Sequence, residues 1–324
     1  MKKIYLHLGT HKTGTSFVQF ALRTNQDVLA TMGVRPVVGA ESNLFLQGID
    51  HDEIRSNWMK DECDVLVFSN ENFVLADNPA RLDLARELRD TAVRAGGDVT
   101  TVFYVRPAVE WLPSMWAQYV KIGSRTFGTL TLDEFIDEYR YESVLEALAD
   151  LRKERETIIR PYVRSLMKNG SIFEDFFDII GVETDRLDSD KEVNATPSRR
   201  QVELARVYNL NQLPGRAARE HHVQLLNSFL RERHYRDPSP TVASTVTKEQ
   251  FQRMSDRYAE REAELTNGAV DSRHMLAKHL VRAPESYAPE VPDEAIDLYL
   301  QNMTILSTVE RLSTFGSNDD RAGM

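Results

Sequence analysis

The start of the chain places an apolar run, a glycine-flanked turn and a helical pattern in direct succession. The mostly apolar residues 4–8 predict a buried strand, and a turn from Gly9 to Gly14 follows at once. From Thr15 onward, apolar residues recur three or four positions apart, which predicts a helix with one buried face. The chain therefore begins with a strand, a tight loop and a helix. The residues expected on the buried face are Phe17, Phe20, Ala21, Thr24 and Val28.

The loop of this first unit has the composition of an anion site. A glycine-rich turn between a strand and a helix directs backbone N–H groups at one point, and the helix dipole adds to their attraction for an anion. Gly9 and Gly14 permit the tight path, and Lys12 adds a positive charge. Every part of this composition suits a phosphate group. Side-chain hydroxyl groups come from Thr13, Thr15 and Ser16.

Further apolar runs alternate with helical segments along the next part of the chain. Strands are predicted at residues 65–68, 99–105 and 158–159, with helices at 78–94 and 109–122. Continuous apolar runs suit parallel strands that are covered on both faces. The alternation predicts an α/β fold, a three-layer parallel sheet with a P-loop-type nucleotide-binding core and additional C-terminal helices.

The remainder of the chain is predicted to be helical. Capping boxes begin at Thr131 and Ser171, a helix starts at Thr196-Pro197, and a long helix starts at Thr247. A last helix is expected from about residue 293. We expect one domain over residues 1–324. Its parts are an α/β core at 1–210, a helical part at 211–315 and a disordered tail at 316–324.

The two loop glycines have the spacing of the nucleoside-triphosphatase P-loop, G-x-x-x-x-G-K-[ST]. Thr15, however, stands where that motif has its lysine, and the lysine of this chain is Lys12, inside the loop. The P-loop lysine must reach the β- and γ-phosphates of Mg-ATP. The departure therefore counts against a kinase or ATPase.

Residues 12–16, Lys-Thr-Gly-Thr-Ser, resemble the 5′-phosphosulfate loop of sulfotransferases, K-[ST]-G-T-[ST]. Residues 6–16 as a whole are similar to the bacterial branch of that superfamily. The resemblance implies that the loop binds the donor PAPS (3′-phosphoadenosine 5′-phosphosulfate) and that Lys12 contacts the oxygen between phosphate and sulfate. Phe17 then lies beside the adenine or is a core residue. The implied donor-binding residues of the loop are Gly9, Thr10, His11, Lys12, Thr13, Gly14, Thr15, Ser16 and Phe17.

A second motif fits the 3′-phosphate of the same donor. In the family, an arginine at a strand end and a serine eight positions later bind this group, and Arg106 and Ser114 have that spacing. A guanidinium is a planar, bidentate partner for phosphate, although an ion pair with Glu110 is the alternative. Residues 114–123 also resemble the family's continuation, S-x-x-x-Q-x-x-K-x-G. Residues 159–194 are more weakly similar to the middle of bacterial sulfotransferases. The resemblance as a whole covers about residues 3–210.

Sulfuryl transfer needs a base for the acceptor's proton and stabilisation of the departing phosphate. Lys12 is the candidate for stabilising the leaving group, and no metal is required. Family members use a glutamate or a histidine as the base. Glu71, just past the strand at 65–68, is the first candidate, and His11 is the second. His7 is expected to be a core histidine, while His221 and His222 cannot be placed.

Composition limits the location and the partners of the chain. The net charge of −10 and the lack of a basic run argue against nucleic-acid binding. The single cysteine, Cys63, excludes a disulfide framework and favours a reducing compartment. We see no signal peptide and no apolar stretch long enough to span a membrane, so we expect a cytoplasmic protein.

Three classes of function are compatible with these motifs. A PAPS-dependent sulfotransferase explains both the loop at residues 9–16 and the pair Arg106 and Ser114. Its acceptor would be a glycan, a lipid-linked sugar, a small molecule or a peptide tyrosine. A P-loop kinase or NTPase that uses Mg-ATP explains the glycine spacing but leaves Arg106 and Ser114 without a role. A non-catalytic binding protein of the same fold is the third. A homodimer is possible, as in other family members.

Overall fold

The computed structural model describes most of the chain. The described residues are 1–48, 52, 54–60, 62–74, 80–154, 156–189, 197–211 and 241–270. Most of the predicted helical part at 211–315, the tail at 316–324 and both His221 and His222 lie outside them. The described residues form two compact units, one from residues within 1–111, 139–189 and 253–270, the other from residues within 112–138, 197–211 and 241–252.

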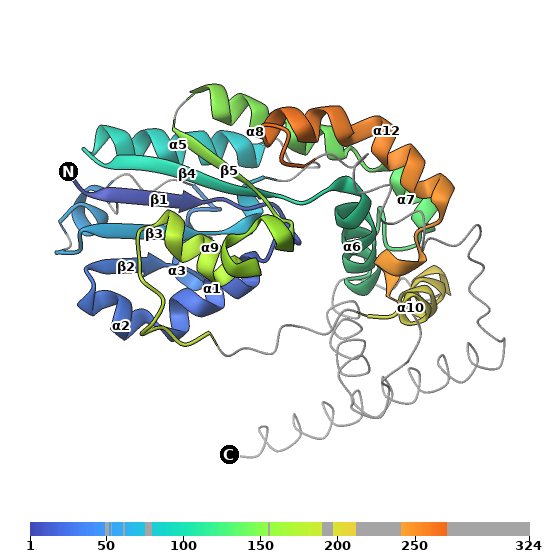
Figure 1. Ribbon diagram of the computed structural model, residues 1–324, viewed down its shortest axis with the longest axis horizontal. Coiled ribbons are helices and arrows are strands. Elements are labelled where there is room, and N and C mark those ends of the chain that lie inside the picture. The colour runs from blue at the N-terminus through green and yellow to red at the C-terminus, as the bar shows by residue number, and fades with distance from the viewer. Residues whose placement is uncertain are drawn as a thin grey trace, which may run out of the picture. The chain divides into compact units, whose positions relative to one another are not determined.

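The first unit contains a parallel sheet, so the α/β prediction is confirmed. In the described part of the chain the sheet has five strands in the order β2-β3-β1-β4-β5, and every neighbouring pair is parallel. β1 lies in the middle, with β3 on one side and β4 on the other (Figure 1). The strands are β1 (Lys3–His7), β2 (Val34–Val37), β3 (Val65–Ser69), β4 (Asp98–Val105) and β5 (Thr157–Pro161).

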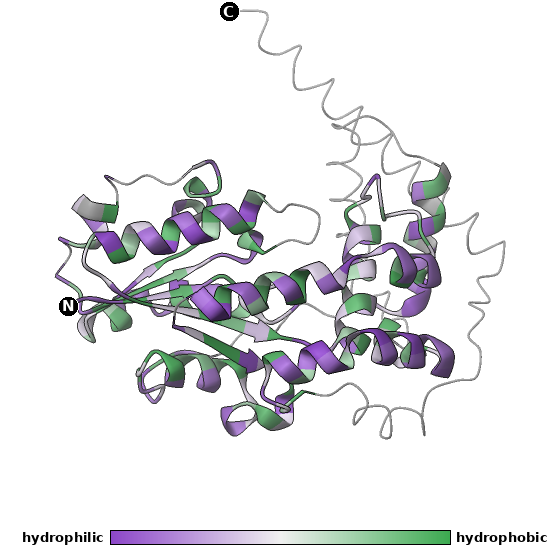
Figure 2. Cartoon of the chain, turned by 90° about the horizontal axis from the view of Figure 1, so that it is seen from above, coloured by the Kyte–Doolittle hydropathy of each residue, from purple (hydrophilic) through white to green (hydrophobic). Residues whose placement is uncertain are grey.

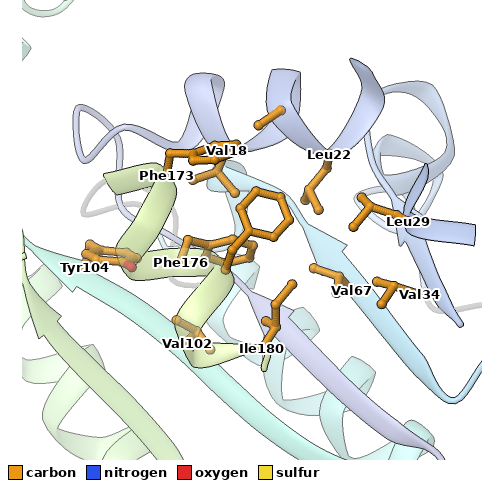
Figure 3. Close-up of a cluster of buried hydrophobic side chains, with 12 residues drawn as sticks. Val18, Leu22, Leu29, Val34, Val67, Val102, Tyr104, Phe173, Phe176 and Ile180 are labelled. Atoms are coloured by element: carbon orange, nitrogen blue, oxygen red, sulfur yellow. The ribbon is translucent and has the colours of Figure 1, made fainter. Parts of the chain in front are cut away.

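One face of the sheet is covered by α1 (Thr15–Thr24), α2 (Gln26–Thr31) and α9 (Ile172–Ile179). Their apolar side chains meet strand residues such as Val67 and Val102 in a buried cluster (Figure 3). Burial of this apolar surface is the main force that holds the helices on the sheet.

Helices also lie over the opposite face. α5 (Ala80–Arg94) contacts β4, and α8 (Tyr141–Glu154) contacts β5. Because neighbouring strand residues point to opposite faces, Phe68 leaves the cluster of Val67 and packs against Phe45, Trp58 and Phe73. The covering helices are hydrophobic along one side and hydrophilic along the other (Figure 2). The fold has the expected three layers.

The second unit is built from helices in its described part. It holds the end of α6 (Ala108–Lys121), α7 (Leu132–Glu138), α10 (Arg199–Asn211) and the start of α12 (Lys248–Leu265). The buried Arg199 guanidinium lies 4.5 Å from the centre of the Trp116 ring. Asn209 donates to the carbonyls of Val120 and Gly128, which ties α10 to the end of α6. Shorter elements of the chain are α3 (Ala40–Leu44), a π-helical turn at Ile54–Trp58, and 3₁₀ turns at Glu71–Phe73, Arg164–Leu166, Lys168–Gly170 and Val242–Thr245.

One of the two predicted capping boxes forms. The Thr131 amide and hydroxyl both donate to Glu134. The long helix predicted from Thr247 begins there, and the Thr247 amide donates to Gln250. The predicted box at Ser171 is wrong, because Ser171 makes no side-chain capping bond and the Glu174 carboxylate accepts from the Thr184 hydroxyl instead.

The predicted buried face of α1 is partly wrong. Val18 and Leu22 are buried with Ala21, whereas Phe17 is half-buried and Thr24 is exposed. The helix ends at Thr24, and α2 begins after Asn25, so a pattern drawn through Val28 combined two helices.

Candidate functional site

The loop after β1 turns sharply and is held from within. Lys12 has a φ of 63° and Gly14 a φ of 81°, both in the left-handed region. The Thr13 hydroxyl donates to the Thr10 carbonyl over 2.6 Å, and the Thr10 hydroxyl donates to the Tyr104 carbonyl on β4. These two bonds fix the loop's path against the neighbouring strand, at the carboxyl edge of the sheet.

The loop ends on the N-terminus of α1. Gly14 is the N-cap and supplies no side chain, and the first amides to bond to its carbonyl are those of Phe17 and Val18. The amides of Thr15 and Ser16 therefore precede the helix's own hydrogen-bond ladder. The Thr15 hydroxyl is buried and has no hydrogen-bond partner among the described residues. Unbonded amides at a helix N-terminus beside a buried hydroxyl are features that suit an anion.

Both loop glycines are required by close neighbours. A Cβ on Gly9 would lie 2.6 Å from Thr15 Oγ1, and one on Gly14 would lie 2.9 Å from Cε2 of Tyr162. Tyr162, directly after β5, thus covers the last residue of the loop. Tyr162 was not predicted to lie here, since the residue is far along the chain and belongs to a weak motif.

Arg106 lies against the loop. Its Nη1 donates to the Lys12 carbonyl over 3.2 Å, and its guanidinium carbon is 5.8 Å from the centre of the Tyr162 ring. Its Nε also donates to Glu110 over 3.3 Å, so the ion pair weighed as an alternative is present as well. The Arg106 side chain is about one-fifth exposed. A phosphate role for Arg106 stays a prediction.

Residues far along the chain hold Arg106 and the loop in place. The Tyr141 hydroxyl donates to the Arg106 carbonyl over 2.8 Å, and the indole of Trp111 donates to the His11 carbonyl over 2.7 Å. The fully buried Glu262 accepts from the Ala108 amide at the start of α6. The sequence did not predict these supports, because nothing in α12 indicates that it returns to α6.

The two candidate bases approach each other from neighbouring strand ends. His11 Nδ1 lies 3.9 Å from Glu71 Oε1, and each side chain is one-quarter exposed. The buried Asn70 accepts from the Asn72 amide, which fixes the short turn that carries Glu71. The pairing of this turn with the loop follows from the parallel register of β1 and β3. Which of the two residues acts as the base stays a prediction.

His7 is a core residue, as expected. It is fully buried between the Tyr104 and Phe176 rings, and its Nδ1 lies 2.9 Å from the Ser69 hydroxyl. Burial lowers the pKa of His7 to about 3. The imidazole is therefore neutral near pH 7.

A buried charge network joins β5 to α9 beside the loop. Asp175 accepts from Arg160, from the Tyr104 hydroxyl and from the Lys168 amide. Burial alone would raise the pKa of the Asp175 carboxyl, but the bonds from Arg160, Lys168 and Tyr104 outweigh it and lower that pKa. Burial and the neighbouring Asp175 raise the pKa of Tyr104. The network keeps β5, and with it Tyr162, in place.

Phe17 and Ser114 are the remaining predicted donor residues. Phe17 lies on α1, half-buried, with its ring centre 6.4 Å from that of Phe173. Ser114 lies on α6 in the second unit, whereas Arg106 belongs to the first. Their roles as donor contacts stay predictions.

Comparison with known proteins yields a single structural likeness to report. No family model matches the chain, and no curated protein matches it. A crystal structure of a sulfotransferase from Alicyclobacillus acidocaldarius is similar to it with a TM-score of 0.34 and 15% sequence identity, over 68% of this chain and 99% of that one. A likeness of this degree assigns neither a fold nor an activity, so the α/β architecture rests on the strand register described above.

Proposed function

We propose that the chain is a sulfotransferase that moves a sulfuryl group from PAPS to a hydroxyl or amine of an acceptor. The observation that supports the proposal is the tight loop before α1, in which Lys12 precedes a helix start with early amides outside the helix's own hydrogen-bond ladder and a buried Thr15 hydroxyl that has no partner among the described residues. A P-loop enzyme would carry its lysine after Gly14, where this chain has Thr15.

Arg106 extends the proposal to a donor with two phosphate groups. Its guanidinium donates to the backbone carbonyl of Lys12, so Arg106 lies beside the loop that carries the lysine. A nucleotide with a 5′-phosphosulfate in the loop and a 3′-phosphate near Arg106 would use both. Mg-ATP would use the loop and leave Arg106 to its pair with Glu110.

The proposed reaction is an in-line displacement at sulfur. The acceptor oxygen or nitrogen forms a bond to sulfur while the bond from sulfur to the 5′-phosphate oxygen breaks. The leaving phosphate gains negative charge, which Lys12 and the loop amides stabilise. The acceptor's proton passes to Glu71 or His11, which lie together at the carboxyl edge of the sheet.

Ligand-dependent thermal stability tests the donor. Adenosine 3′,5′-bisphosphate at about 100 times its dissociation constant should stabilise the chain by about 2.7 kcal/mol, and Mg-ATP should not. Stabilisation by Mg-ATP alone would support the kinase alternative and contradict our proposal. Bisphosphate binding without turnover of radiolabelled PAPS on a broad acceptor panel would support the non-catalytic alternative.

Among the described residues, no helix is both long and apolar enough to cross a bilayer.

A further inference from the structure

Two buried polar atoms under the loop have no hydrogen-bond partner among the described residues. They are His7 Nε2 at the end of β1 and Thr15 Oγ1 at the start of α1. His7 is fully buried and Thr15 is 1% exposed. Leaving such an atom without a partner costs free energy, so each needs an explanation.

Both atoms lie beside Gly9. A Cβ built on Gly9 would be 3.0 Å from His7 Nε2 and 2.6 Å from Thr15 Oγ1. Only glycine leaves room for the imidazole and the hydroxyl to approach each other here. The two atoms do not bond to each other in the structure, so a hydrogen bond between them in the ligand-bound chain is part of the inference made below.

The number of protons on the His7 ring limits the hydrogen bonds that it can make with Thr15. The imidazole is neutral near pH 7, because burial lowers its pKa to about 3, and it therefore carries one ring N–H. If Nδ1 carries the proton, it donates to Ser69, and Nε2 can only accept from the Thr15 hydroxyl. If Nε2 carries it, the Ser69 hydroxyl donates to Nδ1, and Nε2–H donates to Thr15 Oγ1.

These two tautomers have opposite consequences for an anion in the loop. A threonine hydroxyl has one proton and two lone pairs. In the first tautomer its proton points to His7, and only lone pairs face the anion, which is repulsive. In the second, His7 occupies a lone pair, and the hydroxyl proton remains for the anion.

We infer that His7 is a positioning residue that sets the Thr15 hydroxyl as a donor to the bound anion, through the Nε2–H tautomer. The inference rests on the proposed anion site of the loop. Ser69 Oγ–H, His7 and Thr15 Oγ–H then form one chain of donors that ends on the anion. Since Ser69 directly precedes Asn70 and Glu71, the same imidazole connects the loop with the turn that carries a candidate base.

The direct test is the tautomer of His7, read from ¹⁵N NMR of histidine-labelled full-length chain at pH 7. The His7 signal is assigned by its loss in His7→Gln. Saturation with adenosine 3′,5′-bisphosphate, or separately with pyrophosphate, should place the proton on Nε2. In Thr15→Val, which keeps the side-chain shape without a hydroxyl, neither ligand should impose that tautomer.

A matched pair of substitutions tests the effect on affinity. Glutamine places a polar atom near the position of Nε2, whereas asparagine reproduces Nδ1 and loses the group that faces Thr15. His7→Gln should hold the dissociation constant of the bisphosphate near the wild-type value, and His7→Asn should raise it about tenfold. The thermal midpoint of each variant, measured without ligand, shows whether it is folded.

The outcomes separate this inference from the proposed function. Binding of either ligand with the proton on Nδ1, or equal affinities of the two His7 variants, overturns the inference and leaves the donor assignment intact. Pyrophosphate binding with the expected tautomer, but no bisphosphate binding, supports the inference and rejects PAPS. If neither ligand binds, the loop is not an anion site, and both conclusions fall.

Discussion

At the scale of single residues, Lys12 and Arg106 are expected to do different work. Lys12→Ala removes the charge that stabilises the leaving phosphate, so sulfuryl transfer from PAPS should fall about 100-fold or more. Arg106→Ala removes a phosphate partner, so the dissociation constant of the bisphosphate should rise about tenfold. Turnover assays and titration calorimetry measure the two effects. Lys3→Ala, at the other end of β1, is the control. Small and equal effects of both changes would contradict the assignment.

His7 should also make stability depend on pH. Its pKa is about 3 when folded and near 6.5 when unfolded, so the unfolded chain binds the extra proton between these values. The contribution of His7 to stability is complete above pH 6.5 and is lost as pH falls toward 3, by about 1.4 kcal/mol for each pH unit.

Urea unfolding at a series of pH values measures the slope of the unfolding free energy against pH. His7→Gln should reduce that slope, because the variant has no imidazole to take up the proton on unfolding. A slope that His7→Gln does not alter would show that another group controls the acid sensitivity.

At the scale of elements, α12 is expected to support the donor site from a distance. Glu262 is the buried partner of the Ala108 amide, two residues after Arg106. Glu262→Ala should destabilise the chain by about 1–3 kcal/mol, because the amide is left without its partner. It should also weaken bisphosphate binding, because the segment that carries Arg106 loosens.

Glu264→Ala is the matched control, on the same helix but exposed. Thermal unfolding and bisphosphate titration of both variants check the expectation. A Glu262 variant that loses stability but binds the ligand normally would show that Arg106 does not depend on α12.

The sequence predicted some elements better than others, for local reasons. β1, β3 and β4 are continuous apolar runs, and the structure has strands there. β2 was missed because Val34–Val37 contains an arginine and a proline, which a strand at the sheet edge can accommodate. The box at Thr131 formed, whereas the box at Ser171 did not, because the Glu174 carboxylate accepts from the Thr184 hydroxyl.

At the scale of the whole molecule, only those residues of the candidate site that belong to short local motifs could be predicted. The loop, Arg106 and Glu71 each sit at a strand end, and parallel register brings strand ends together, so their meeting follows from the sequence pattern. Tyr162, Trp111 and Glu262 come to the site through packing between distant segments. Such contacts depend on which helices cover which strands, and no short motif records that.

The place of β1 at the centre of the sheet also bears on how the chain acquires its structure during synthesis. Lys3 pairs with Val65 on one side and with Asp98 on the other, so β1 is synthesised before either of its neighbours in the sheet. Non-local pairing of this kind slows folding. The segment that carries the loop is therefore made before its partners and ordered only after them, and until β4 is synthesised the apolar side chains of β1 are open to contact with a chaperone.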